Sequence, residues 1–245
     1  IIEKCELRDR ILLLKRVFLE APLLPDECLK PLLGLILVQE YTPYGLDLLK
    51  DLSVLRPPRK AKFLRYLLNF CVHERVDIRE KALEHIVNIY HSHKLMPQRI
   101  DEFALEWSNC LEREIPPSSL FGEEYGRLVV ETAWREDVAK VCLIVLLALV
   151  PYKPELFLVL LTQIYTNTSA DLKRTILRSI DPAIKKLGPD NALLLQLIDE
   201  SPKGCETLII RIIYILTERQ ATPHPELVLR VRELYKNKIK DVRVL

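Results

Sequence analysis

The chain has 245 residues, of which 49% are hydrophobic and 29% are charged, so it can bury a large core and lacks the composition of a disordered protein. Its 36 basic and 34 acidic residues leave a net charge of +2, without the basic excess that nucleic-acid-binding domains usually carry. Only 6 residues are glycine, so we expect few glycine-rich phosphate loops or tight β-hairpins, which depend on this residue.

Helical spacing of apolar residues recurs along the whole chain. Most segments begin at a proline or a capping residue, which suits the first turn of a helix, and end at a short polar break. The predicted helices cover residues 7–20, 26–39, 43–55, 58–73, 76–92, 98–112, 134–149, 154–166, 170–187, 190–199, 204–219 and 225–237. Pro182 lies inside one of these runs, and we expect it to kink or split that helix because proline removes a backbone donor.

Several of these helices carry patterns that predict how they are buried. The 208–216 segment is apolar except at Arg211, so we expect neighbours on nearly all of its sides. The longest apolar run, residues 141–150, has about half the length of a membrane span and predicts a buried helix. Two further helices carry one apolar stripe each, formed by Ile78, Ala82, Ile86, Ile89 and Tyr90 and by Leu227, Val231, Leu234 and Tyr235.

A helix-opening pattern, an acid followed by an apolar residue and then Lys or Arg, recurs at Asp77, Asp171 and Asp241. The acid can cap free N–H groups, and the basic residue can pair with an acid of an adjacent repeat, so that a ladder of ion pairs forms. The copies are unevenly spaced, which indicates degenerate repeats. The pattern is typical of HEAT or armadillo solenoids, and we expect residues 1–245 to form a single all-α, HEAT/armadillo-like solenoid segment of about 12 helices.

The last copy of this pattern begins at Asp241, and the given sequence continues only to residue 245. We expect it to be the opening turn of a helix that the chain end cuts off. The stripe that contains Leu227 and Leu234 would then lack its natural cover, and we expect that stripe to be exposed.

The stretch between Arg113 and Ala133 interrupts the helical pattern with prolines, serines and glycines. Structureless loops of this length are uncommon and are often functional or disordered. One interpretation is a tolerated surface insertion, and the other is a loop that contacts a partner. The candidate contact residues in this loop are Leu120, Phe121, Leu128, Val129 and Val130. In a third interpretation Phe121 folds back and fills a gap between helices of its own chain.

No arrangement of residues typical of catalysis or metal binding is recognisable. His91 and His93 are two residues apart, so on a helix their rings point to different faces and make a poor metal pair. His73, His85 and His224 have no Cys or Ser at the spacing of a nucleophilic site. The 6 cysteines form no C-x-x-C pair, which indicates a reducing, intracellular compartment. We therefore expect that the protein is not an enzyme and has no catalytic residues, metal site or cofactor.

The densest basic cluster lies at residues 56–62 and includes Arg59, Lys60 and Lys62. Such a cluster suits a phosphate-contacting turn or a nuclear-import patch. The alternative is a solvated turn between two helices, which the balanced net charge favours. Direct RNA contact through basic inter-helix turns is the second hypothesis for function, and the same balance of charge weighs against it.

Specific stretches of the chain resemble the C-terminal region of the symplekin family. They are SPKGCETL at 201–208, LTER at 216–219, PELVLRVRELY at 225–235, APLLPDE at 21–27, SLFG at 119–122 and ADLKRTILR at 170–178. These stretches are spread over most of the chain and are more specific than helical patterning alone.

The resemblance implies a non-catalytic scaffold of pre-mRNA 3′-end processing, in polyadenylation and in histone pre-mRNA cleavage. Members of the family hold the endonuclease subunit of the cleavage and polyadenylation specificity factor together with its inactive paralogue, and they also engage the cleavage stimulation factor. A nuclear location follows from the resemblance, with a cytoplasmic or cell-junction pool as a further expectation. No family-defined contact residue maps onto a position of this chain.

Overall fold

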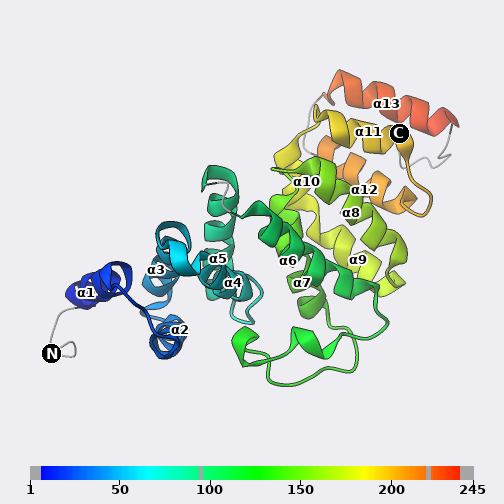
Figure 1. The fold of residues 1–245 in the computed structure, drawn as a ribbon. Helices are drawn as coiled ribbons and strands as arrows, with labels where there is room; N and C mark the ends of the chain where they lie inside the picture. Colours follow the sequence, from blue (N-terminus) through cyan, green and yellow to red (C-terminus); the bar gives the residue numbers. More distant parts are fainter. Residues whose placement is uncertain (1–6, 94–95, 219–221, 238–245) are drawn as a thin grey trace. The chain divides into compact units, whose positions relative to one another are not determined.

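The computed structural model describes residues 7–93, 96–218 and 222–237, and within them the architecture is all-α, with thirteen α-helices and no β-strand (Figure 1). The helices are α1 Leu7–Glu20, α2 Leu29–Leu37, α3 Thr42–Leu55, α4 Lys60–Cys71, α5 Val76–Asn88, α6 Pro97–Asn109, α7 Glu136–Leu149, α8 Pro154–Asn167, α9 Ala170–Ser179, α10 Asp181–Leu187, α11 Ala192–Glu200, α12 Glu206–Thr217 and α13 Pro225–Asn237. The all-α prediction is therefore confirmed.

Pro182 divides the expected 170–187 helix into two. The first part, α9, ends at Ser179, and α10 begins at Asp181, so the proline occupies the first turn of the second helix. A proline in that turn costs no hydrogen bond, whereas inside a continuous helix it would remove one. The predicted split is confirmed, and it explains why thirteen helices are found where the sequence indicates about twelve.

The chain divides into two compact units, and the division falls within α6. The first unit contains Ile1–Ile100 and Phe121–Val130, and the second contains Asp101–Leu120 and Glu131–Leu245. In the first unit α3 is central and packs against α1, α2, α4 and α5. In the second unit α7 packs against α8 and α9, α10 packs against α9 and α12, and α11 packs against α8 and α13.

The patterns that predict burial are confirmed for α5, α7 and α12. The whole stripe from Ile78 to Tyr90 is buried, and so is most of the apolar run in α7. Between residues 208 and 216 of α12 the side chains on nearly all sides are covered, and Tyr214 is the exception, with 53% of its surface exposed. Among the described residues, no helix combines the length and the apolar character that crossing a bilayer requires.

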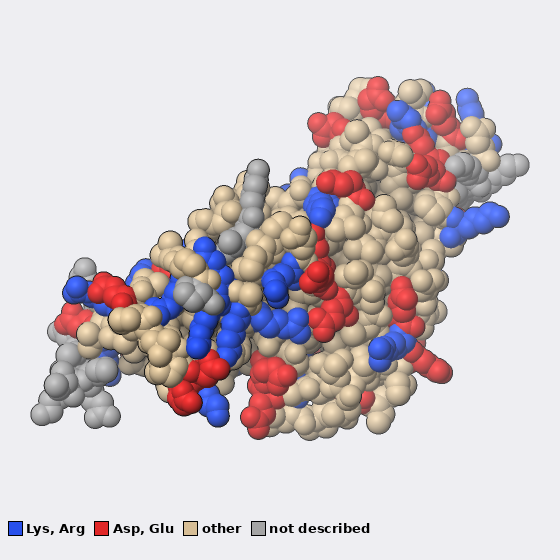
Figure 2. All heavy atoms as spheres, in the orientation of Figure 1, with Lys and Arg blue, Asp and Glu red and all other residues tan. Residues whose placement is uncertain are grey.

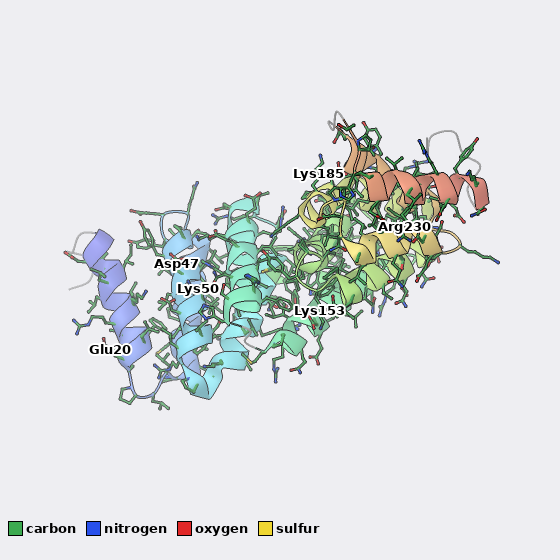
Figure 3. All side chains as sticks on the ribbon, turned by 90° about the horizontal axis from the view of Figure 1, so that it is seen from above. Glu20, Asp47, Lys50, Lys153, Lys185 and Arg230 are labelled. Carbon is green, nitrogen blue, oxygen red and sulfur yellow. The ribbon has the colours of Figure 1, made fainter. Side chains whose placement is uncertain are left out.

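The prediction for the α13 stripe is wrong. Leu227, Val231 and Leu234 are buried and Tyr235 is half-buried, because α13 packs against α11, which lies earlier in the chain. Arg230 of α13, labelled in Figure 3, also pairs with Asp199 of α11. The cover comes from a helix earlier in the chain, so none is needed from the segment that begins at Asp241. That segment lies outside the described residues.

The ladder of ion pairs between repeats stays a prediction, because the ion pairs found at two helix starts involve arginines that precede the acid instead of following it. Arg75 Nε and Nη2 donate to the two carboxylate oxygens of Asp77 at 3.1 and 2.5 Å, and Arg135 makes the same fork with Asp137 at 3.1 and 2.6 Å. In both cases the arginine precedes its helix in an extended conformation, so its guanidinium group reaches the acid two residues later. These ion pairs are local to one helix start.

In the first unit, arginine side chains donate hydrogen bonds to the C-terminal carbonyls of helices to which they do not belong. Arg56, which follows α3, donates from Nη1 to the Phe18 carbonyl at 2.8 Å and from Nη2 to the Ala21 carbonyl at 2.6 Å, at the C-terminal end of α1. Arg75 donates in the same way to the Leu37 carbonyl at the end of α2. The last carbonyls of a helix lack partners within the helix and form the negative end of its dipole, so a cation stabilises them.

We therefore expect Arg56→Met to loosen α1. Hydrogen bonds to charged groups contribute about 1.5–3 kcal/mol each, so the free energy of unfolding of the first unit should fall by at least the contribution of one such bond. Urea denaturation and amide hydrogen exchange of α1 measure the two effects. The control is Arg16→Met, which removes an exposed arginine whose pairing with Glu20 at 3.4 Å is contained in α1, and it should cost less than about 0.5 kcal/mol. Equal effects of the two substitutions would contradict the capping role.

Candidate partner-binding surfaces

The basic cluster at residues 56–62 is occupied largely by contacts within the chain. Arg59 Nη1 and Lys62 Nζ lie 2.5 and 2.8 Å from Asp26 Oδ1, and these cations, Lys62 first, lower the pKa of the Asp26 carboxyl group. Arg56 is bound to the end of α1, and Lys60, at the start of α4, is partly exposed. On the face drawn in Figure 2, basic and acidic side chains are interspersed. The contacts of Arg56, Arg59 and Lys62 within the chain favour a structural turn over a phosphate-contacting surface.

The segment between Arg113 and Ala133 is more ordered than the sequence indicates. It contains two single 3-10 turns, at Ser118–Leu120 and Glu123–Tyr125. Residues 122–127 close on themselves, because Gly122 N donates to Arg127 O at 2.7 Å and Arg127 N donates to Gly122 O at 3.1 Å. We call residues 122–127 the clasp.

The clasp docks on the C-terminal end of α4. Arg127 Nη2 donates to the Val72 carbonyl at 2.6 Å, and the Tyr125 carbonyl accepts from Glu74 N at 2.8 Å. The side chains of Tyr125 and Arg127 are buried. Arg127 thus stabilises the end of α4 as Arg56 stabilises the end of α1, and the clasp is part of the first unit's fold.

Gly126 is required where the clasp meets α4. Its φ of +73° lies in the left-handed region that side chains rarely adopt, and a Cβ atom there would lie 3.0 Å from Cε1 and Nε2 of His73. The His73 ring is itself held in place, because its Nδ1 accepts a hydrogen bond from Arg75 N at 3.1 Å and its ring packs beside Phe70. Backbone and ring therefore approach each other closely only because residue 126 has no side chain.

The candidate contact residues of this segment fall into two groups. Leu120 is buried, with 1% of its surface exposed, so it belongs to the core and offers no surface to a partner. Phe121 is half-buried. By contrast, Leu128, Val129 and Val130 are 74%, 73% and 56% exposed. We call these three residues the apolar strip.

Sequence reasoning missed the residues that position this strip. Tyr125, Gly126 and Arg127 were not candidates, although they hold the clasp against α4. The available signal was the placement of two glycines, Gly122 and Gly126, four residues apart in a chain with only 6. Glycine in a glycine-poor chain indicates a turn or a close approach of backbone, and both occur here.

A charged groove lies at the start of α7 and α9 in the second unit. Its volume is about 620 Å³, and Arg135, Arg174 and Arg178 line it together with Ile115 and Trp134. Trp134 is fixed by a hydrogen bond from its Nε1 to the Arg113 carbonyl at 3.0 Å. We call this hollow the α7–α9 groove.

The histidines are placed separately from one another. His91 and His93 are exposed at the end of the α5 segment, and His85 is buried with its Nε2 2.8 Å from Oδ1 of Asp47, labelled in Figure 3. Burial nevertheless lowers the pKa of His85. Among the described residues, no three His, Cys, Asp or Glu side chains come together in a way that could hold a metal ion.

No family model matches the chain, and no solved structure matches it. Function is therefore inferred from the resemblance in the sequence and from the surfaces of the two units. Among the described residues, the apolar strip and the α7–α9 groove each bring exposed side chains together.

We expect Gly126→Ala to weaken the docking of the clasp. A side chain at φ +73° that also crowds the His73 ring should lower the free energy of unfolding by about 1–3 kcal/mol. The control is Gly34→Ala in α2, where a Cβ atom meets nothing within 4 Å. That substitution should leave stability unchanged or raise it by about 0.5–1 kcal/mol, because alanine suits a helix better than glycine does. Urea denaturation of both variants tests the difference.

Stability should also depend on the protonation of His73. Burial first, and then the positive charges of Arg75 and Arg127, lower the pKa of His73 from 6.5 to about 4. The unfolded chain therefore takes up this proton at a higher pH than the folded chain, so the stabilising contribution of neutral His73 is lost as the pH falls from 6.5 to about 4.

The variant His73→Asn keeps an acceptor for Arg75 N but does not titrate. The stability difference between the original chain and this variant should shrink across that pH window, as measured by urea denaturation at successive pH values. A difference that stays constant from neutral pH down to pH 4 would show that the proton uptake of His73 is not linked to folding.

Proposed function

We propose that this chain is a segment of a non-catalytic, HEAT/armadillo-like solenoid scaffold of the symplekin type. The resemblance carries this proposal, above all the runs at 201–208 and 225–235. The succession of helices supports the solenoid, because nearly all of the packing pairs join helices that are next or next but one in chain order. Packing between near neighbours in the chain is what a stacked array of helical repeats produces.

The proposed role is the assembly of the pre-mRNA 3′-end cleavage and polyadenylation machinery, and of the histone pre-mRNA cleavage machinery, in the nucleus. The partners would be the endonuclease subunit of the cleavage and polyadenylation specificity factor, its inactive paralogue and the cleavage stimulation factor. The mechanism is binding through exposed side chains, without a chemical step.

The apolar strip is the surface that best suits such binding. Leu128, Val129 and Val130 are consecutive, and each has more than half of its surface in solvent. Exposed apolar clusters often mark contact sites, since their burial against a partner removes apolar surface from water. The strip directly follows Arg127, which is buried against α4, so its first residue starts from a fixed point. A fixed starting point reduces the entropy that binding must overcome.

The triple substitution Leu128→Ser, Val129→Ser and Val130→Ser tests this assignment. It removes exposed side chains, so the melting temperature and helicity should change little. Binding to the purified pair of the endonuclease subunit and its paralogue, or to the stimulation factor, should weaken by about tenfold or more, since loss of central apolar contacts typically costs at least 1–2 kcal/mol.

A matched control replaces three exposed apolar residues elsewhere, Val159, Leu193 and Leu229, by serine. This control should bind as the original chain does. If the original chain binds neither partner, the scaffold proposal is wrong. If it binds and both triple variants bind equally well, the scaffold proposal stands and the apolar strip is not the contact surface.

A further inference from the structure

The three arginines of the α7–α9 groove are brought together from two parts of the second unit. Arg135 precedes α7, while Arg174 and Arg178 lie one turn apart on α9. Packing of α9 against α7 directs them toward the same hollow of about 620 Å³. Three guanidinium groups facing one cavity form a concentrated set of charged donors.

The acids that pair with Arg174 and Arg178 hold them weakly, whereas Arg135 is held by two hydrogen bonds to Asp137 at 3.1 and 2.6 Å and by one to Glu131 at 3.0 Å. Arg174 lies 3.3 Å from Asp171, and Arg178 lies 3.2 Å from Glu136, which also pairs with Lys140 at 2.8 Å. More than half of each of the three arginine side chains is exposed to solvent. Exposed ion pairs contribute little to stability, because water competes for both charges. A doubly charged anion can therefore displace the carboxylates from Arg174 and Arg178 without disturbing the fold, while Arg135 remains fixed beside them.

We propose that the α7–α9 groove binds a phosphorylated serine or threonine side chain in a peptide segment of a partner protein. A phosphate dianion has three acceptor oxygens and carries more charge than the carboxylates that it would displace. Guanidinium groups match phosphate geometry with paired N–H donors, so arginines suit this ligand better than lysines would. This inference is independent of the proposed scaffold partners, since it concerns a different surface.

The acidic residues that line the groove favour a peptide ligand over RNA. The carboxylates of Glu114, Glu136 and Asp171 line the same hollow, and hydrogen bonds from Lys140 and then Arg178 lower the pKa of Glu136 and keep it ionised. These acids would repel a continuous run of phosphates, whereas a peptide can place a single phosphate at the arginines and basic side chains at the acids. Ile115 is exposed and Trp134 is partly exposed at the groove, so an apolar side chain of the peptide has a surface to contact.

Fluorescence anisotropy with the complete chain tests the proposal. The probes are a pool of short degenerate peptides with a fixed central phosphoserine or phosphothreonine, the same pool without phosphate, and a single-stranded uridine oligonucleotide. The phosphorylated pool should bind about tenfold more tightly than its unphosphorylated copy, since hydrogen bonds between charged groups are the stronger kind and a tenfold change needs only one or two of them.

The double variant Arg174→Gln and Arg178→Gln should lose that tenfold preference, because glutamine keeps donors but carries no charge. The matched control, Lys203→Gln and Arg232→Gln, removes two exposed positive charges of the same unit that lie outside the groove, and it should keep the preference. Thermal melts establish that both variants are folded.

Equal binding of the two peptide pools, or no binding of either, would overturn the proposal. So would a phosphate preference that survives in the groove variant, or one that the control variant loses equally, because the effect would then reflect overall charge. Tighter binding of the uridine oligonucleotide than of the phosphorylated pool, lost in the groove variant, would overturn it in favour of an RNA site.

Discussion

The fold of the first unit depends on arginine side chains that complete the ends of helices to which they do not belong. Arg56 serves α1, Arg75 serves α2 and Arg127 serves α4. Each guanidinium group supplies donors to carbonyls that the helix itself leaves unpaired, and its charge faces the negative end of the helix dipole. Helices often end instead at a glycine in the left-handed conformation, but this chain has only 6 glycines. Arginine from a neighbouring turn takes over that role.

Because several arginines have this structural role, a cluster of basic residues in the sequence does not by itself indicate a binding surface. In the cluster at residues 56–62, Arg56 is committed to a helix end, and Arg59 and Lys62 are committed to Asp26. A cluster of positive charge in the sequence is therefore largely neutralised by contacts within the fold. Arg174 and Arg178 of the α7–α9 groove differ, because their partners are exposed carboxylates that an incoming anion can replace.

The clasp connects the same interaction to the surfaces proposed for binding. Arg127 and the Tyr125 carbonyl hold the clasp on the end of α4. The apolar strip follows the clasp directly, so it starts from a fixed point, and its three residues are exposed. Gly126 permits this arrangement, since any side chain there would meet His73. A scaffold benefits from such placement, because a contact residue that is already held in position loses less entropy when a partner binds.

The sequence by itself determined the helices, the break at Pro182 and the buried faces of α5, α7 and α12, because these follow from spacing and propensity over a few neighbouring residues. It also indicated that the stretch between Arg113 and Ala133 is exceptional. Only the tertiary structure decided that Leu120 is buried while Leu128 is exposed, that α11 covers the stripe of α13, and that Arg174 and Arg178 share a groove with Arg135. These outcomes depend on which segments meet in space, and periodicity along the chain carries no information about residues that are distant in sequence.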